Sequence, residues 1–312
     1  MLMMVTGCST EAKNLEEASN LTILTVEFNS GAPVPDLYIS LLDAETGEEI
    51  DSLIGSAEGE ATFEGVQEGK DYIISATTLK NSVLGEGFTT VEQVTFDNTQ
   101  PYFLVQTHSS REYQQLDVPI VMQKPELPHG CEITSLTAVL NYYGVSVTKT
   151  EMAENYLKKM AFRTVAGQKI GPNPNNAFAG DPSDLKGGTY VYAAPIVEAA
   201  KKAILEKQAS LQVTDVSGHS KDEILALVKE GVPVVIWVTL DLTKPRTSGG
   251  WRIDGTDDYH KMYQNLHAVV LTGHMLDKVV VMDPLKGYTT YSDSNFFQSY
   301  VDLGMQAVAV HK

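Results

Sequence analysis

Cysteine, long apolar runs and clustered basic residues are scarce in this sequence. Its 312 residues include only two cysteines, Cys8 and Cys131, which excludes a disulfide scaffold and leaves each thiol to be explained separately. No stretch approaches the roughly 18 apolar residues that a membrane-spanning helix requires. No segment has the surplus of Lys and Arg that a nucleic-acid-binding face needs, so we expect no nucleic-acid partner.

The acidic residues are distributed unevenly along the chain. Residues 9–110 contain 18 acidic and 3 basic residues, a net charge of −15, whereas residues 111–312 contain 22 acidic and 20 basic residues, a net charge of −2. A chain of this length can hold two domains. The change in charge predicts two separate bodies that meet near residues 106–110.

The chain begins with a short apolar run that ends at Val5-Thr6-Gly7-Cys8. An apolar residue followed by two small residues and a cysteine resembles the lipobox of bacterial lipoprotein signal peptides. The resemblance implies that residues 1–8 are a signal remnant, that Cys8 is lipidated, and that residues 9–20 are a tether. The protein would then be extracellular and anchored to the bacterial cell membrane through Cys8 alone. The alternative is an apolar N-terminus with an idle thiol, because the run is short and no basic residue precedes it.

Between residues 21 and 108 the apolar residues follow a period of two, which is typical of strands. Gly, Pro, Asn and Asp separate the candidates, and no combination of side chains in this region suggests catalysis. The turn-and-strand pattern resembles the transthyretin-like or collagen-adhesin B-type repeats of bacterial surface proteins. We therefore predict a small antiparallel β-sandwich that acts as a spacer or, as an alternative, as a binding domain. The predicted strands are Leu21–Phe28, Leu37–Leu42, Tyr72–Thr77, Val91–Phe96 and Tyr102–Gln106.

Residues 111–312 combine helical and strand patterns, which predicts an α+β domain. Thr148 and Ser220 each stand three residues before a glutamate, the spacing of a capping box at a helix start. The Gly-, Pro- and Asn-rich residues 171–188 and the polar residues 241–262 predict two long loops. The other predicted elements are a helix over 189–208, strands over 232–240, 267–272, 278–282 and 288–291, a helix over 294–302 and a last strand over 306–311.

Cys131 stands at the start of a predicted helix. Ile133, Leu136, Leu140 and Tyr143 recur at spacings of three and four, which is typical of an apolar helical stripe, and a glycine at position 144 suits the left-handed residue that ends a helix. Backbone N–H groups at a helix start favour a negative charge, so we expect the pKa of this thiol to be lowered. The sequence therefore favours a nucleophile over a small buried hydrophobic residue.

A thiol nucleophile needs a base, and the base needs an acceptor that orients it. His267 opens one strand of a predicted hairpin, and Asp283 ends the partner strand before Pro284. The start of one strand lies opposite the end of its partner in an antiparallel hairpin, so the two side chains should be neighbours. A carboxylate beside the imidazole fixes its tautomer and leaves the other ring nitrogen for the thiol.

The reaction also needs a donor for the oxyanion that develops in the transition state. The backbone N–H of Cys131 is one candidate, and a side-chain amide should supply the second. Gln123 lies in residues 118–123, which we expect to form a short strand that runs toward the nucleophile. An exposed glutamine with no role is the alternative.

The order Gln, Gly-Cys at a helix start, His and Asp on consecutive strands resembles papain-like cysteine peptidases. More narrowly, residues 115–312 resemble the stand-alone extracellular members of the bacteriocin-processing (double-glycine leader) peptidase family. That resemblance implies Cys131 as nucleophile, His267 as base, Asp283 as orienting group and Gln123 in the oxyanion hole, acting on a peptide or protein substrate without cofactor. The sequence contains no nucleotide-binding motif, so cleavage coupled to export is not expected. The matching segments are Asp117-Val118-Pro119, Gly130-Cys131-Glu132, Asn141-Tyr142-Tyr143-Gly144, Gly180-Asp181-Pro182, His267-Ala268-Val269-Val270 and Asp283-Pro284.

Other functions are compatible with parts of the sequence. Three histidines, at 260, 267 and 274, have no known zinc-ligand spacing, and residues 254–258 lack the carboxylates of a complete calcium loop. A non-catalytic surface adhesin on a peptidase-like fold is a further alternative. So is a cell-wall peptide amidase or a transglutaminase-type acyl transferase, because these enzymes share the same triad chemistry.

Overall fold

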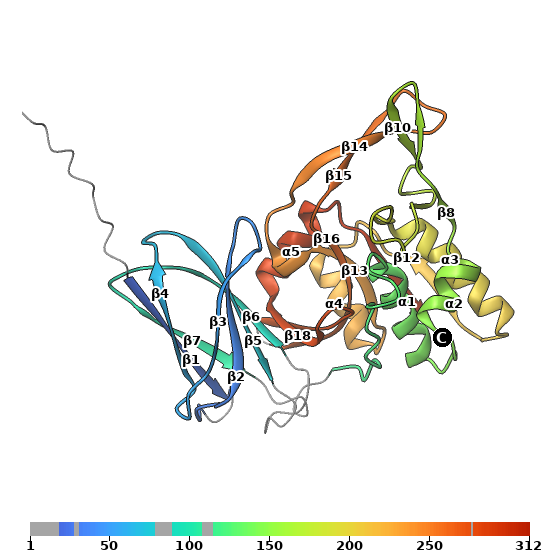
Figure 1. The fold of residues 1–312 in the computed structure, drawn as a ribbon. Helices are drawn as coiled ribbons and strands as arrows, with labels where there is room; N and C mark the ends of the chain where they lie inside the picture. The colour runs from blue at the N-terminus through green and yellow to red at the C-terminus, as the bar shows by residue number, and fades with distance from the viewer. Residues whose placement is uncertain (1–18, 28–30, 79–88, 108–114, 276) are drawn as a thin grey trace, which may run out of the picture.

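A computed structural model describes residues 19–27, 31–78, 89–107, 115–275 and 277–312. The lipobox with Cys8, residues 9–18 of the predicted tether and most of the predicted boundary near residue 108 therefore lie outside the described residues, whereas Ser19 and Asn20, the predicted end of the tether, belong to the first strand. Within the described part, no helix is long and apolar enough to cross a membrane. Figure 1 shows the N-terminal strands beside a larger body that contains all the helices.

Seven strands fill the described part of residues 19–107. All five predicted strands are present, and two more, β3 and β4, complete the set. β3 has no buried residue and therefore no apolar alternation that a sequence could reveal. The strands are β1 (Ser19–Glu27), β2 (Leu37–Asp43), β3 (Glu49–Ile54), β4 (Glu60–Val66), β5 (Asp71–Thr78), β6 (Thr89–Thr95) and β7 (Tyr102–Thr107).

These strands form two layers around a common apolar cluster. One layer has the order β4-β1-β7, and the other has the order β6-β5-β2-β3. Alternate residues of β1, β2 and β5 point into the cluster, including Ile23, Ile39 and Ile74, which are fully buried. The expectation of a purely antiparallel arrangement is wrong, because β1 and β7 pair in parallel.

The larger body is built on a sheet that continues into the N-terminal strands. The order of this ten-stranded sheet is β12-β19-β13-β16-β17-β18-β6-β5-β2-β3. β18 and β6 pair in parallel, with Tyr291 opposite Val91. Strands of the larger body are β12 (Gln212–Asp215), β13 (Val234–Thr239), β16 (Leu266–Met275), β17 (Lys278–Asp283), β18 (Gly287–Ser292) and β19 (Ala307–His311).

The two bodies predicted from the charge distribution thus share one sheet. They also share apolar packing, because Ile73 of β5 and Val91 of β6 belong to the same buried cluster as Tyr291 and Phe296 of the larger body. An ion pair between Lys278 and Glu92 spans the same junction. The prediction of two separate bodies is not confirmed, because most charges of the acidic segment lie on exposed positions, and β6 meets β18 through buried Thr89, Thr90 and Val91.

Helices cover both faces of the sheet in the larger body. Alternate residues of β13 separate the faces: Val235 and Trp237 pack with α1 and α3, whereas Val234 and Ile236 pack with α4 and α5. Both predicted capping boxes, at Thr148 and Ser220, are confirmed. The helical segments are α1 (Cys131–Tyr142), α2 (Lys149–Glu151), the π-helical turn η1 (Met152–Tyr156), α3 (Ala193–Glu206), α4 (Lys221–Lys229), the 3₁₀ turn η2 (Leu240–Leu242) and α5 (Asp293–Asp302).

An arm of short strands projects from the larger body (Figure 1). Its sheet has the order β15-β14-β10-β9. The predicted loop over residues 241–262 is therefore wrong, since most of it forms the hairpin of β14 and β15. Its polar residues face solvent on a narrow arm, and only a few side chains such as Trp251 are buried. The strands are β9 (Arg163–Val165), β10 (Gln168–Gly171), β14 (Thr247–Ile253) and β15 (Tyr259–Tyr263), with β8 (Lys159–Met160) and β11 (Phe178–Ala179) paired near the base.

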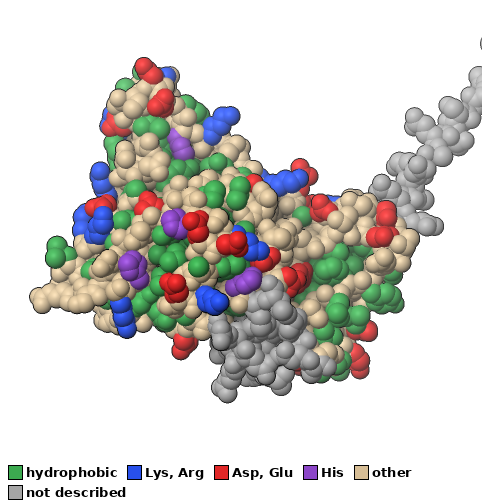
Figure 2. Space-filling model, turned by 180° about the vertical axis from the view of Figure 1, so that it is seen from behind, with side chains coloured by type: hydrophobic (Ala, Val, Ile, Leu, Met, Phe, Trp, Pro, Cys, Tyr) green, Lys and Arg blue, Asp and Glu red, His purple; other side chains and the backbone are tan. Residues whose placement is uncertain are grey.

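Acidic and basic side chains are interspersed over the face of the molecule seen in Figure 2. No continuous area of Lys and Arg covers the described residues on that face. This distribution agrees with the near balance of charge in residues 111–312.

The shared sheet predicts that a charge at the junction destabilises the whole protein. Val91→Asp places a carboxylate at a position that is 3% exposed and lies in the apolar cluster with Tyr291 and Phe296. We expect the free energy of unfolding to fall by at least about 3 kcal/mol. Urea unfolding followed by circular dichroism measures it. Val165→Asp, the same substitution at a site 51% exposed, is the control and should change little. Equal effects of both substitutions would show that the junction is not packed as described.

Candidate active site

Cys131 is the first residue of α1, as predicted, and Gly130 is the residue that caps the helix. A Cβ atom at position 130 would lie 2.7 Å from the Cβ of Leu127, so only glycine fits this approach to the helix. The Cys131 side chain is 7% exposed. At the other end, Gly144 adopts the predicted left-handed conformation with φ of +83°.

Ser135 fixes the helix against the strand that carries the histidine. Its Oγ donates a hydrogen bond to the carbonyl of Ala268 at 3.1 Å. Ala268 follows His267 on β16, and its backbone also acts on Cys131 through a hydrogen bond that favours the thiolate. The start of α1 and the start of β16 are thus held together.

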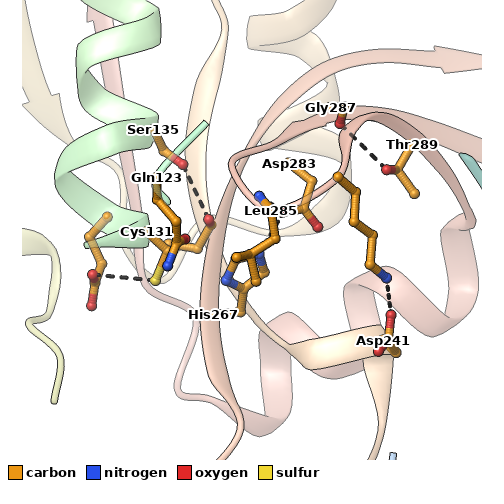
Figure 3. Close-up of polar contacts among 12 residues, drawn as sticks. Gln123, Cys131, Ser135, Asp241, His267, Asp283, Leu285, Gly287 and Thr289 are labelled. Carbon is orange, nitrogen blue, oxygen red and sulfur yellow. Dashed lines mark hydrogen bonds and ion pairs between the residues drawn. The ribbon is translucent and has the colours of Figure 1, made fainter. Parts of the chain in front are cut away.

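His267 and Asp283 are neighbours, as predicted. His267 Nε2 lies 2.9 Å from Asp283 Oδ1, and the side chains are only 4% and 1% exposed. They are diagonal rather than directly opposite, because Val270 pairs with Met282 in this register. Since Nε2 is engaged by the carboxylate, Nδ1 is the ring nitrogen left for the thiol. In Figure 3 the His267 ring lies between Cys131 and Asp283.

Asp283 receives further support from the turn that follows it. The backbone N–H of Leu285 donates to Oδ1 at 2.7 Å, and Tyr291 Oη donates to Oδ2 at 3.5 Å. Burial opposes the negative charge, but the charge and hydrogen bond of His267, the charge of Lys286 and the Leu285 amide outweigh it and lower the pKa of Asp283. The carboxylate is therefore ionised at neutral pH.

Lys286 and Asp241 form an ion pair beside this turn that the sequence did not reveal. Asp241 adopts the left-handed region with φ of +50°, which is uncommon for a residue other than glycine. The pairing holds the segment after β13 against the turn that carries Asp283. No local pattern predicts it, because the partners are 45 residues apart.

Gln123 is buried beside the thiol, although the predicted strand over residues 118–123 is wrong. The segment is irregular, and isolated hydrogen bonds hold it in place. In one of them, the backbone N–H of Gln123 donates to the carbonyl of Pro284 at 2.8 Å. The side-chain Nε2 donates one proton to the carbonyl of Pro128 at 2.8 Å, which leaves its second proton free to donate elsewhere. In Figure 3 the side chain points toward the Cys131 sulfur. Pro119, within this segment, removes a donor that a strand would need.

Glu132 is a fourth ionisable group at the site, and no role for it is predicted from the sequence. Its side chain is fully buried. Oε2 accepts a hydrogen bond from Cys131 Sγ at 3.3 Å, and Oε1 accepts one from the backbone N–H of Val191 at 2.9 Å. Burial raises the pKa of Glu132 to about 7. The only sequence signal is a glutamate within an otherwise uncharged helix.

The expected lowering of the Cys131 pKa is contradicted. Burial, then the charge and hydrogen bond of Glu132, raise the pKa of the thiol well above its ordinary value, and only the Ala268 backbone favours the thiolate. The helix start does favour a negative charge, but a neighbouring carboxylate and loss of solvent oppose it more strongly. Cys131 is therefore a protonated thiol in this structure.

The three histidines considered for zinc lie in different surroundings. His260 approaches Tyr190 Oη at 2.7 Å, His267 bonds Asp283, and His274 approaches Asp293 at 3.1 Å. Among the residues that the structure describes, no group of three or more His, Cys, Asp or Glu side chains is arranged to hold a metal ion.

Two of the three carboxylates considered for calcium pair with arginines of the arm. Asp254 pairs with Arg163, and Asp257 pairs with Arg252. Asp254 is thereby held against β9, which carries Arg163.

Comparison with known proteins relates the chain to one peptidase family. Residues 115–308 match the Peptidase_C39 like family. The uncharacterised protein YvpB of Bacillus subtilis strain 168 is 31% identical over 194 residues, which cover 61% of this chain and 72% of YvpB. A crystal structure from Bacillus anthracis, provisionally named a C39-like peptidase, is 32% identical, with a TM-score of 0.54, and covers 64% of this chain and 98% of the other.

A double-glycine motif protease from an AMS/PCAT transporter, solved with its leader peptide, is more distant. It is 18% identical with a TM-score of 0.35, over 65% of this chain and 94% of the other. The family resemblance inferred from the sequence is confirmed by the match over residues 115–308.

The lowered pKa of Asp283 predicts a specific loss of stability in acid. A carboxyl group with a folded pKa below its ordinary value of 3.8 stabilises the fold above that value, and the stabilisation is lost as the pH falls below it. Asp283→Asn should lower the free energy of unfolding at pH 7 by about 1–3 kcal/mol and should flatten its decline below pH 4. Urea unfolding at pH 3–7 measures both. Asp257→Asn, at a fully exposed side chain, serves as control. Parallel curves for wild type and Asp283→Asn would contradict the assignment.

Proposed function

The chain belongs to the C39-like peptidase family, and on this basis we propose that it is a cysteine peptidase whose nucleophile is Cys131. The observation that carries the proposal is the convergence at one buried place of the Cys131 thiol, the His267–Asp283 pair and the Gln123 amide. These groups come from three separate parts of the chain. A structural role for any one of them does not account for all four together.

The proposed reaction begins with proton transfer from Cys131 Sγ to His267 Nδ1. The sulfur attacks the carbonyl carbon of the substrate, and Asp283 stabilises the imidazolium through Nε2. His267 then donates the proton to the leaving amine as the C–N bond breaks. Water, deprotonated by the same imidazole, hydrolyses the thioester and releases the acid and the thiol.

The oxyanion receives two donors in this proposal. One is the backbone N–H of Cys131, which has no intrahelical partner because it is the first residue of α1. The other is the second Nε2 proton of Gln123, whose first proton is fixed by Pro128. Donors that are already oriented lower the barrier without reorganisation during the reaction.

The substrate class is a peptide or protein, proposed from the family. A cell-wall peptide amidase or an acyl transferase would use the same groups, and a non-catalytic binding protein would have no need of them. Surface location and lipidation at Cys8 are proposals that rest on the Val5–Cys8 motif alone. For residues 21–108 we propose a β-sandwich fixed to the peptidase through β6 and β18.

A covalent probe tests the activity directly. A peptide with a cysteine-reactive electrophile should label Cys131 in the wild type and not in Cys131→Ala, and mass spectrometry identifies the site. A peptide mixture incubated with both proteins should show cleavage products with the wild type only. Cleavage by Cys131→Ala would exclude this nucleophile, and labelling without any cleavage would favour the acyl-transfer or binding alternative.

Loss of the proposed oxyanion donor should slow catalysis. Gln123→Ala should lower kcat by about 10²–10³-fold, because the interaction is made in the transition state. The rate is measured on the best peptide from the mixture, with circular dichroism to verify folding. Gln298→Ala, an exposed glutamine on α5, is the matched control and should retain full activity. A kcat within a few-fold of the wild type would remove Gln123 from the oxyanion hole.

A further inference from the structure

Glu132 has no step in the proposed reaction, yet its carboxylate contacts the sulfur. Oε2 lies 3.3 Å from Cys131 Sγ, with the thiol as donor. The second oxygen is fixed by the Val191 amide at 2.9 Å, so the carboxylate cannot turn away from the thiol without losing that bond. Both residues belong to α1, and the contact is buried.

The charge of a fully buried carboxylate needs compensation by hydrogen bonds or opposite charges, and Glu132 has few of these. Among the described residues, no Lys or Arg forms an ion pair with Glu132. The titratable groups of this site come from three elements: Cys131 and Glu132 from α1, His267 from β16 and Asp283 from β17. The charges of both acids oppose a thiolate, and the single base is engaged by Asp283.

The hydrogen bond has a direction that matters for reactivity. A thiol can donate to an ionised carboxylate, but a thiolate beside that carboxylate is repelled by it. A neutral Glu132 reverses the relation, because its O–H can donate to the thiolate. The protonation of Glu132 and the ionisation of Cys131 are therefore coupled across one hydrogen bond.

We propose that Glu132 is a positioning residue that holds the resting Cys131 as a thiol and releases it as a thiolate only when Glu132 itself is protonated. The inference rests on the proposed function in one respect, the role of Cys131 as nucleophile. The proposed role of Glu132 explains why Cys131, although it begins a helix, is a thiol and not a thiolate in this structure. It also predicts a site that resists small electrophiles at neutral pH.

Alkylation of Cys131 by iodoacetamide tests the proposal without a substrate. Glu132→Gln keeps an acceptor for Val191 and replaces the acceptor facing sulfur with an N–H donor. The rate of Cys131 alkylation at pH 7 should rise at least about tenfold, the effect of one unit in thiol pKa, with the titration midpoint shifted to lower pH. Glu154→Gln, an exposed glutamate on η1, should leave the profile unchanged. Site-specific mass spectrometry separates Cys131 from Cys8.

Identical pH profiles of alkylation for wild type and Glu132→Gln would overturn the proposal and leave Glu132 as a structural anchor for Val191.

If Glu132→Gln does not fold, a second variant, His267→Ala, removes the base and leaves the thiol of Cys131 and the carboxyl group of Glu132 to titrate against each other. Its alkylation rate should rise with pH, level off as Glu132 ionises, and rise again as the thiol loses its proton; the levelling should lie above pH 7, because the charge of His267 no longer lowers the pKa of Glu132. A single titration in that variant would equally overturn the proposal. The peptidase proposal fails separately, through peptide cleavage by Cys131→Ala.

Discussion

The buried hydrogen bond between His267 and Asp283 requires that the surrounding structure compensate the charge of the carboxylate. An ionised carboxylate that is 1% exposed is costly unless hydrogen bonds and opposite charge compensate it. The turn after β17 supplies the Leu285 amide and Lys286, and Asp241 balances the lysine in turn. The pairing of β16 with β17 brings His267 and Asp283 together, and the turn after β17 stabilises the ionised form of Asp283. Removing one member should therefore lower the stability of the fold.

The sheet that carries this pair does not end at the peptidase-like region. β18, next to the strand that ends in Asp283, pairs on its other edge with β6 of the N-terminal segment. A strand edge with unpaired N–H and C=O groups is prone to association, and this junction covers one such edge. The acidic N-terminal strands are thus part of the support of the site.

Two opposing effects act on the pKa of Cys131, and their relative magnitudes decide whether the thiol is protonated. A helix start typically stabilises a negative charge by about 0.3–1 kcal/mol, and up to about 2 when partly buried. Burial of an ionisable group can shift its pKa by several units, each about 1.4 kcal/mol, and an adjacent carboxylate adds to the shift. Burial and Glu132 therefore outweigh the helix start. A thiol with this balance depends on its partners to ionise.

The sequence by itself determined the main helices and central strands of the larger body and the residue types of the candidate site. The stripe around Leu136 predicted α1, the apolar runs predicted β16 and β17, and their order predicted that His267 and Asp283 are neighbours, because these features depend on local periodicity and short hairpins. Only the tertiary structure decided the burial of Glu132 and the pairing of β6 with β18. Both depend on segments distant in the chain, whose desolvation and strand contacts leave no local pattern. The protonation state of Cys131 follows from that burial, which is why a correct helix prediction led to the wrong pKa.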